Sequence, residues 1–113
     1  MTLEAMRRAE IARLNDHFRF TGEGGWTYLS RGVAALPIMA KEAAIRAVRH
    51  FADFTPDNDP HGEHDCALLS VGEHRIMWKI DYYPHNDTRD HAPDPADPAT
   101  TKRVMTIMLA GEC

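Results

Sequence analysis

Cysteine is scarce in this sequence. Only two of its 113 residues are cysteines, Cys66 and Cys113, and the second of them is the last residue. Two cysteines placed in this way build neither a disulfide framework nor a cysteine-based metal site. Because reduced thiols are typical of the cytoplasm, we expect a cytoplasmic protein.

Long hydrophobic runs are also missing. No stretch approaches the roughly 18 apolar residues of a membrane-spanning helix. The first thirteen residues are charged, whereas a signal peptide would carry an apolar run there. We therefore expect no membrane among the partners of this protein.

Catalytic motifs are absent as well. Ser30 and Ser70 do not stand in the G-x-S-x-G setting of a hydrolase nucleophile. The glycines at 22–25 follow a predicted helix and precede a predicted strand, which is the reverse of the order in a phosphate-binding loop. Cys66 stands in an apolar segment, so we expect it in the core rather than at a reactive site. The sequence predicts no cofactor.

The residues that are present fit one globular domain. Apolar residues make up 43% of the chain and charged residues 27%, close to the average of folded proteins. A length of 113 residues suits a single compact domain spanning residues 1–113.

Hydrophobic periodicity predicts three helices. They are expected over residues 2–20, over about 37–53 and over about 100–110, the last being apolar around most of its circumference. Lys102 and Arg103 would then stand in a first helical turn, where cations are unfavourable. We expect the acidic stretch just before them to offset their charge; a bound anion is the alternative.

Three strands are predicted between these helices. They are expected over residues 26–31, 66–71 and 75–83, and Gly72 with Glu73 forms the turn of a hairpin between the last two. The order α-β-α-β-β-α predicts an α+β fold with a small three-stranded, largely antiparallel sheet. Its core should contain Trp78, Ile80, Ile107 and Met108.

Acidic residues are concentrated in two loops. The net charge is only −4, but residues 53–65 and 81–98 together carry ten of the 17 acids and one of the 13 bases. One loop enters the predicted hairpin and the other leaves it, so both should lie at the same end of the strand pair. We expect the following acids to bind a partner: Asp57, Asp59, Glu63, Asp65, Asp87, Asp90, Asp94 and Asp97.

The first acidic loop also contains two histidines, His61 and His64. With a two-residue hairpin turn, His64 would lie opposite Asp81, and a carboxylate beside an imidazole favours general base catalysis. Three interpretations stay open: a loop whose polar side chains cap turns, a metal site, and an acid–base site. The H-x-x-H spacing alone is weak evidence for zinc, so we favour the structural interpretation and expect no tightly bound metal.

Four strings of the sequence carry a family resemblance. They are LND-x-F at 14–18, F-x-PDNDPHGEHD at 54–65, WKIDYY at 78–83 and DP-x-DP-x-TT-x-RVMTIMLA at 94–110. Through them the chain resembles the bacterial domain-of-unknown-function family 3768, although it departs at Cys66 and at residues 111–113. The resemblance implies a small stand-alone bacterial protein, often on mobile elements, and favours a counter-defence role over a metabolic one.

Two functional hypotheses follow. The first is a non-enzymatic inhibitor, of the anti-CRISPR or anti-restriction kind, whose acidic loops bind the basic surface of a nucleic-acid-handling complex. The second is a small acid–base or metal-dependent enzyme using His61, His64 and Asp81. Direct nucleic-acid binding is not expected, because the basic residues are scattered along amphipathic helices.

Overall fold

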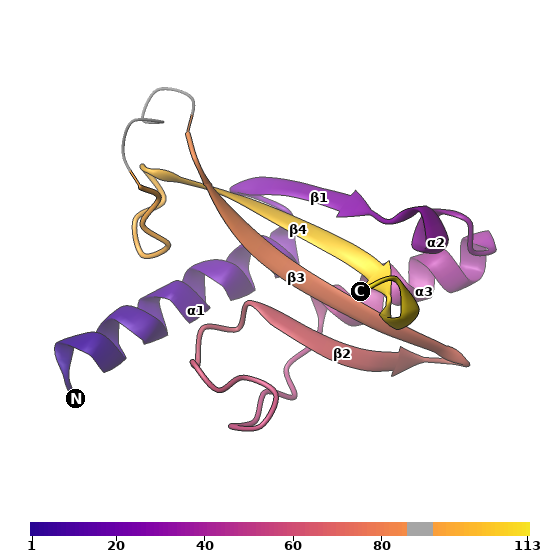
Figure 1. Cartoon of the computed structure of the whole chain (residues 1–113), viewed down its shortest axis with the longest axis horizontal. Coiled ribbons are helices and arrows are strands. Elements are labelled where there is room, and N and C mark those ends of the chain that lie inside the picture. The colour runs from indigo at the N-terminus through magenta and orange to yellow at the C-terminus, as the bar shows by residue number, and fades with distance from the viewer. Residues whose placement is uncertain (86–91) are drawn as a thin grey trace.

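The computed structural model describes residues 1–85 and 92–113 as an α+β fold with a mixed sheet of four strands in the order β1-β4-β3-β2 (Figure 1). β2 (Cys66–Val71) and β3 (His74–Pro84) form the predicted antiparallel hairpin, with Gly72 at φ +58° in its turn. β4 (Thr101–Leu109) lies antiparallel to β3 and parallel to β1 (Gly25–Leu29). The predicted α+β class is confirmed, but the prediction of three largely antiparallel strands is wrong in its detail.

The error arises at β4, which we predicted to be a helix. Burial alternates along it: Thr101, Arg103, Met105 and Ile107 are buried and the residues between them are half-buried. A short apolar run is compatible with either a helix or a central strand, and here Val104 and Met108 place apolar side chains on the face opposite the core as well, which hides the strand alternation in the sequence. The three-residue 3-10 helix η2 (Ala110–Glu112) is the only helical structure that follows it in the described chain.

Helix α1 (Leu3–Thr21) begins and ends as the sequence indicates. The Thr2 hydroxyl accepts a hydrogen bond from the Ala5 amide at 3.0 Å, which caps the first turn. At the other end Gly22 adopts φ +80°, and its amide donates to the Phe18 carbonyl at 2.7 Å.

Two further helices follow β1. Ser30 ends the first predicted strand early, because its hydroxyl accepts a hydrogen bond from the Val33 amide and caps the short helix α2 (Arg31–Ala34). Helix α3 (Ile38–Arg49) starts directly after Pro37, as predicted, and ends a few residues sooner than we expected.

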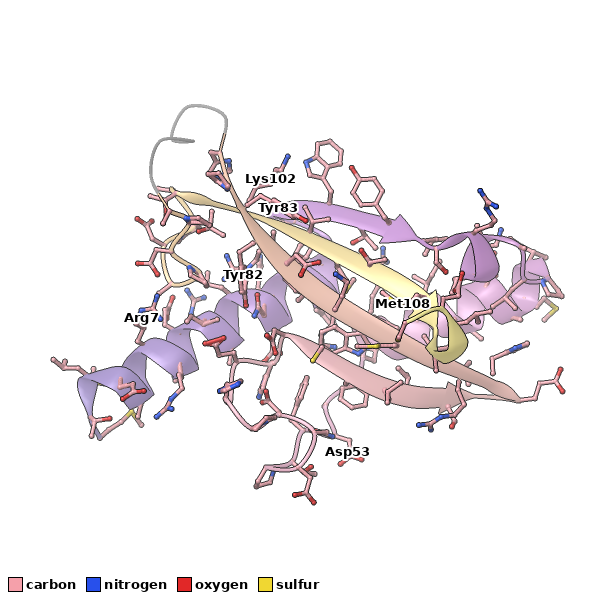
Figure 2. The ribbon with its side chains drawn as sticks, viewed as in Figure 1. Arg7, Asp53, Tyr82, Tyr83, Lys102 and Met108 are labelled. Atoms are coloured by element: carbon pink, nitrogen blue, oxygen red, sulfur yellow. The ribbon has the colours of Figure 1, made fainter. Side chains whose placement is uncertain are left out.

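The core lies between one face of the sheet and the helices, which lie behind the strands in Figure 1. Trp78, Ile80 and Ile107 belong to this core, as predicted. Met108 does not: it faces the other side of the sheet, where it pairs with Met77 and contacts the Cys113 thiol (Figure 2). Cys66 also points to that side and is half-buried rather than in the core.

Candidate functional site

Helix α1 brings the two acidic loops together. An Arg7 guanidinium nitrogen lies 2.6 Å from Asp94 Oδ1, in the segment that precedes β4. Two turns further along, the Asn15 amide donates to the Glu63 carbonyl at 2.9 Å. Residues 54–65 and 92–99 therefore lie at the same end of the hairpin, which confirms that prediction for the part of the chain described.

A buried polar network fixes this arrangement. The fully buried Asn15 side chain donates to the Tyr82 hydroxyl at 2.8 Å and accepts from Arg103 Nε at 2.7 Å. Arg103 also donates to the Pro95 carbonyl, and burial lowers the pKa of Arg103. Burial raises the pKa of Tyr82 to about 12. Because 101–109 is a strand, Arg103 points into the core and Lys102 points away, so the predicted first-turn conflict with a helix dipole does not exist.

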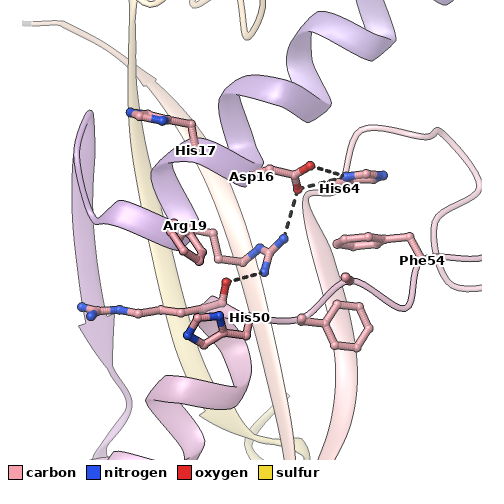
Figure 3. Close-up of a pocket in the computed structure, with 10 residues that line it drawn as sticks. Asp16, His17, Arg19, His50, Phe54 and His64 are labelled. Atoms are coloured by element: carbon pink, nitrogen blue, oxygen red, sulfur yellow. Dashed lines mark hydrogen bonds and ion pairs between the residues drawn. The ribbon is translucent and has the colours of Figure 1, made fainter.

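His64 fastens the first acidic loop to α1. Its Nδ1 lies 2.9 and 3.0 Å from the two carboxylate oxygens of Asp16 (Figure 3). Its Nε2 lies 3.5 Å from Asp59 Oδ2. The imidazole stacks on the Phe54 ring, with centroids 3.8 Å apart and planes at 2°. The expected pairing with Asp81 is wrong, because His64 adopts φ +54° and turns away from the hairpin, whereas Asp81 binds Lys79 at 2.6 Å.

Arg19 lies beneath this pair and is almost completely buried. It donates to Asp16 at 3.0 Å and to the Val48 carbonyl at 2.7 Å, and its guanidinium carbon lies 4.7 Å from the centre of the Trp78 ring. Burial lowers the pKa of Arg19. Arg19 Nε and Trp78 Nε1 are buried without a hydrogen-bond partner among the described residues. The site is therefore a packed electrostatic network that joins α1, α3 and the loop.

A cavity of about 410 Å³ opens beside Arg19 and His64 (Figure 3). Histidine, arginine and phenylalanine side chains dominate its lining, with the Asp16 carboxylate among them. No serine, threonine, cysteine or lysine of the described chain lines it, so it offers no hydroxyl, thiol or amine nucleophile. Both ring nitrogens of His64 already face carboxylates, which leaves neither nitrogen directed at a substrate.

The predicted partner-binding acids fall into different environments. The Asp59 side chain is only 5% exposed and lies against the His64 imidazole. Asp94 forms an ion pair with Arg7 and accepts a hydrogen bond from the Ala96 amide. Asp97 caps the Ala99 amide, and Asp57 is exposed in the loop. The remaining two predicted acids of the second loop, Asp87 and Asp90, lie outside the described residues.

Glu63 and Asp65 form the centre of an unneutralised cluster. Burial raises the pKa of both carboxyls, and for Glu63 the charge of Asp65 adds to the effect. Asp59 raises both pKa values further; the charge of His61 opposes it at both carboxyls, and the charge of Arg7 opposes it at Glu63. No base of the described chain forms an ion pair with Glu63 or Asp65. This part of the surface holds like charges at close range.

The described residues contain no group of three or more histidine, cysteine, aspartate or glutamate side chains that could hold a metal ion. Likewise, no helix within residues 1–85 and 92–113 has the length and apolar character needed to cross a membrane.

Three site residues on α1 were missed by the sequence analysis: Asn15, Asp16 and Arg19. A signal for them exists. Asn15 and Arg19 are four residues apart and fall on the same helical stripe as Ile11 and Phe18, so the spacing places polar groups on the buried face. Buried polar groups need partners, which marks that stripe as the place to look for a network.

The chain was compared with known proteins. No curated protein and no solved structure matches it. One family description, Protein of unknown function (DUF3768), matches residues 29–112, from the end of β1 to η2, and leaves out α1 with its three network residues. Since this match covers more than half of the sequence, the chain belongs to the DUF3768 family of proteins of unknown function.

Proposed function

We propose that this protein is a non-enzymatic binding protein that docks its acidic end onto a basic surface of a partner protein. The observation that carries the proposal is the pair Glu63 and Asp65. Both carboxyls are half-buried, both have a raised pKa, and no base of the described chain pairs with either. Carboxylates of like charge that lie close together destabilise the folded state, and such destabilising groups are typical of functional surfaces.

A basic partner would remove that cost. Lysine or arginine side chains placed beside Glu63 and Asp65 would favour the ionised carboxylates and offset their mutual repulsion. Exposed Asp57 in the same loop would extend the contact. Charges at the edge of such an interface mainly steer association and select the partner.

The partner class follows from the charge. Proteins that handle nucleic acids carry surfaces of lysine and arginine built to bind phosphates, and an acidic protein surface can occupy them. CRISPR and restriction complexes belong to this class, and inhibition of such a complex is the role we propose. The alternative of an acid–base enzyme has less support, because His64 is held by Asp16 and Asp59 and no hydroxyl, thiol or amine nucleophile of the described residues lines the adjacent cavity.

The experiment is quantitative affinity capture from the native host, comparing the wild type with Glu63→Gln/Asp65→Asn. The matched control is Glu42→Gln/Glu73→Gln, which changes the net charge equally at two exposed acids outside the cluster. We expect a nucleic-acid-handling protein to be captured by the wild type and the control and lost by the cluster variant. Equal capture by all three proteins would contradict the proposal.

A further inference from the structure

The face of the sheet opposite the core is open over most of its area. Its exposed large side chains are Trp26 (60% exposed), Tyr28 (57%), Tyr83 (49%) and Leu68 (49%). Of the residues that the structure describes, η2 and Cys113 cover part of it, at the end where Met77 and Met108 lie. Exposed apolar groups gathered on one face mark an interaction surface.

Strand register places these aromatic groups close together. Trp26 and Tyr28 are two residues apart on β1, so their side chains stand about 6.6 Å apart on the same face. Tyr83 on β3 lies directly opposite Lys102 on β4 (Figure 2), and Lys102 is the next outward residue along β4 from the Val104 that pairs with Trp26. Trp26 and Tyr83 therefore lie nearest Lys102 at one end of the sheet, and Tyr28, opposite Thr106, extends the aromatic row along β1.

The charge of this face is opposite to that of the whole chain. Its one carboxylate among the described strand residues, Asp81, is neutralised by Lys79 at 2.6 Å. Lys102 and Arg75 form no ion pair with any described residue. The protein has a net charge of −4, yet the outward strand residues of this face include two bases, Lys102 and Arg75, that no acid of the described strands compensates.

A cavity lies beside Trp26 and Lys102. This cavity of about 390 Å³ is lined by Trp26, Lys102, His85 and Pro98 together with Gly24 and Gly25. An indole wall and an ammonium group in one hollow suit a flat ring attached to a phosphate, because the ring can stack while the phosphate meets the cation.

We propose that the open face of the sheet binds single-stranded nucleic acid, with bases stacking on Trp26, Tyr28 and Tyr83 and a phosphate held by Lys102. Unpaired bases offer the ring faces that exposed aromatic side chains can stack on, and every base has one. A second copy of the chain fits less well, because a symmetric contact would bury Lys102 and Arg75 of both copies in one interface without an acid of these strands to compensate them. The proposal uses residues distinct from Glu63 and Asp65 and does not depend on the acidic end.

The test is fluorescence anisotropy of labelled oligothymidylate and oligouridylate of about twelve nucleotides, a typical site size for such surfaces. We expect binding at low salt with a Kd on the order of 10 µM, which weakens as salt rises. Trp26 supplies a second readout, since stacking quenches an exposed indole whereas Trp78 is fully buried. Comparing the two oligonucleotides shows whether the surface prefers DNA or RNA.

The variants separate stacking from charge. Trp26→Ala and Tyr83→Ala should each weaken binding roughly tenfold, the loss expected for one stacked base. Lys102→Ala should lower the salt dependence by about 0.7 in log Kd per log salt, the value for one phosphate contact on a single strand. The controls are Phe20→Ala, an exposed aromatic on α1, and Lys41→Ala on α3, which should both bind like the wild type. Circular dichroism confirms that each variant is folded.

Three results would overturn the proposal. The first is no anisotropy change up to roughly 100 µM protein at low salt. The second is binding that Trp26→Ala and Tyr83→Ala leave unchanged. The third is a dimer, seen by sedimentation velocity, that the same substitutions abolish, which would assign the face to a second copy. Glu63→Gln/Asp65→Asn should bind the oligonucleotide at least as well as the wild type, so this test and that of the acidic end can fail separately.

Discussion

Replacing His64 with alanine should loosen the 54–65 loop from α1 and destabilise the fold by about 2–4 kcal/mol. The substitution removes a contact to Asp16 at 2.9 Å, a longer one to Asp59 at 3.5 Å and the stack on Phe54. The stack is worth about 0.5–1.5 kcal/mol. The Asp16 contact contributes less than a buried pair would, since its side chain is 43% exposed.

The largest part of the loss comes from Asp59. Its side chain is 5% exposed, so the alanine variant leaves a buried carboxylate with its imidazole partner removed. Asp59 Oδ1 keeps its hydrogen bond from the backbone amide at position 64 at 3.2 Å, so the cost is that of losing the imidazole alone, roughly 1–3 kcal/mol. Alanine also tolerates the φ of +54° at position 64 poorly, whereas asparagine adopts it more readily. His64→Asn should therefore cost less than His64→Ala.

Urea denaturation of the two variants, the wild type and a double-mutant cycle with Asp16→Asn measures these terms. We expect the costs of His64→Ala and Asp16→Asn to be less than additive, because both remove the same contact. An unchanged denaturation midpoint for His64→Ala would refute the reasoning. Strict additivity would show that Asp16 and His64 do not interact in solution.

The other predictions concern the core and the charged network. Trp78→Ala should cost about 3–5 kcal/mol in urea denaturation, because a fully buried indole is removed from the centre of the core. Arg103→Met should be destabilising by roughly 1–3 kcal/mol in the same assay, since it leaves the buried Asn15 carbonyl oxygen without its donor. Glu63→Gln/Asp65→Asn should be more stable than the wild type at neutral pH. The pKa of both carboxyls is raised in the folded state, so the wild type loses stability as pH rises above their ordinary values of about 4, and the advantage of the variant should grow from pH 4 to 7 in parallel denaturation curves.

Much of the fold follows from local signals in the sequence. Thr2 and Gly22 delimit α1, Pro37 precedes α3, and Gly72 turns the hairpin. Each of these residues acts through its own backbone or its nearest neighbours, so sequence alone identifies them. The same holds for the position of the two loops, which follows from where they join the hairpin.

The failure at residues 101–109 has a non-local cause. This segment is a strand because β1 and β3 both pair with it, and nothing within the segment itself distinguishes a buried strand from a buried helix. Because of this error, the open face of the sheet could not be predicted. Lys102 was assigned to a helix, and β1, which carries Trp26, was not expected to pair with residues 101–109.

The candidate site was only half predictable. His64 and the acids of its loop stand out in the sequence, and their residue types indicated an interacting cluster. Their partner Asp16 lies 48 residues earlier in the chain, on a helix whose docking no local pattern specifies. His64 turns toward it because of its left-handed backbone, a conformation that the HGEHD string does not reveal.

The acidic end is tested most directly by the association rate constant for the captured partner, measured for the wild type, Glu63→Gln/Asp65→Asn and Glu42→Gln/Glu73→Gln. Charges that steer docking act mainly on this constant. We predict that the cluster variant associates roughly tenfold more slowly than the control of equal net charge. The difference should vanish at about 1 M salt, where the screening length is about 3 Å. Equal association rates for the two variants at low salt would contradict the account.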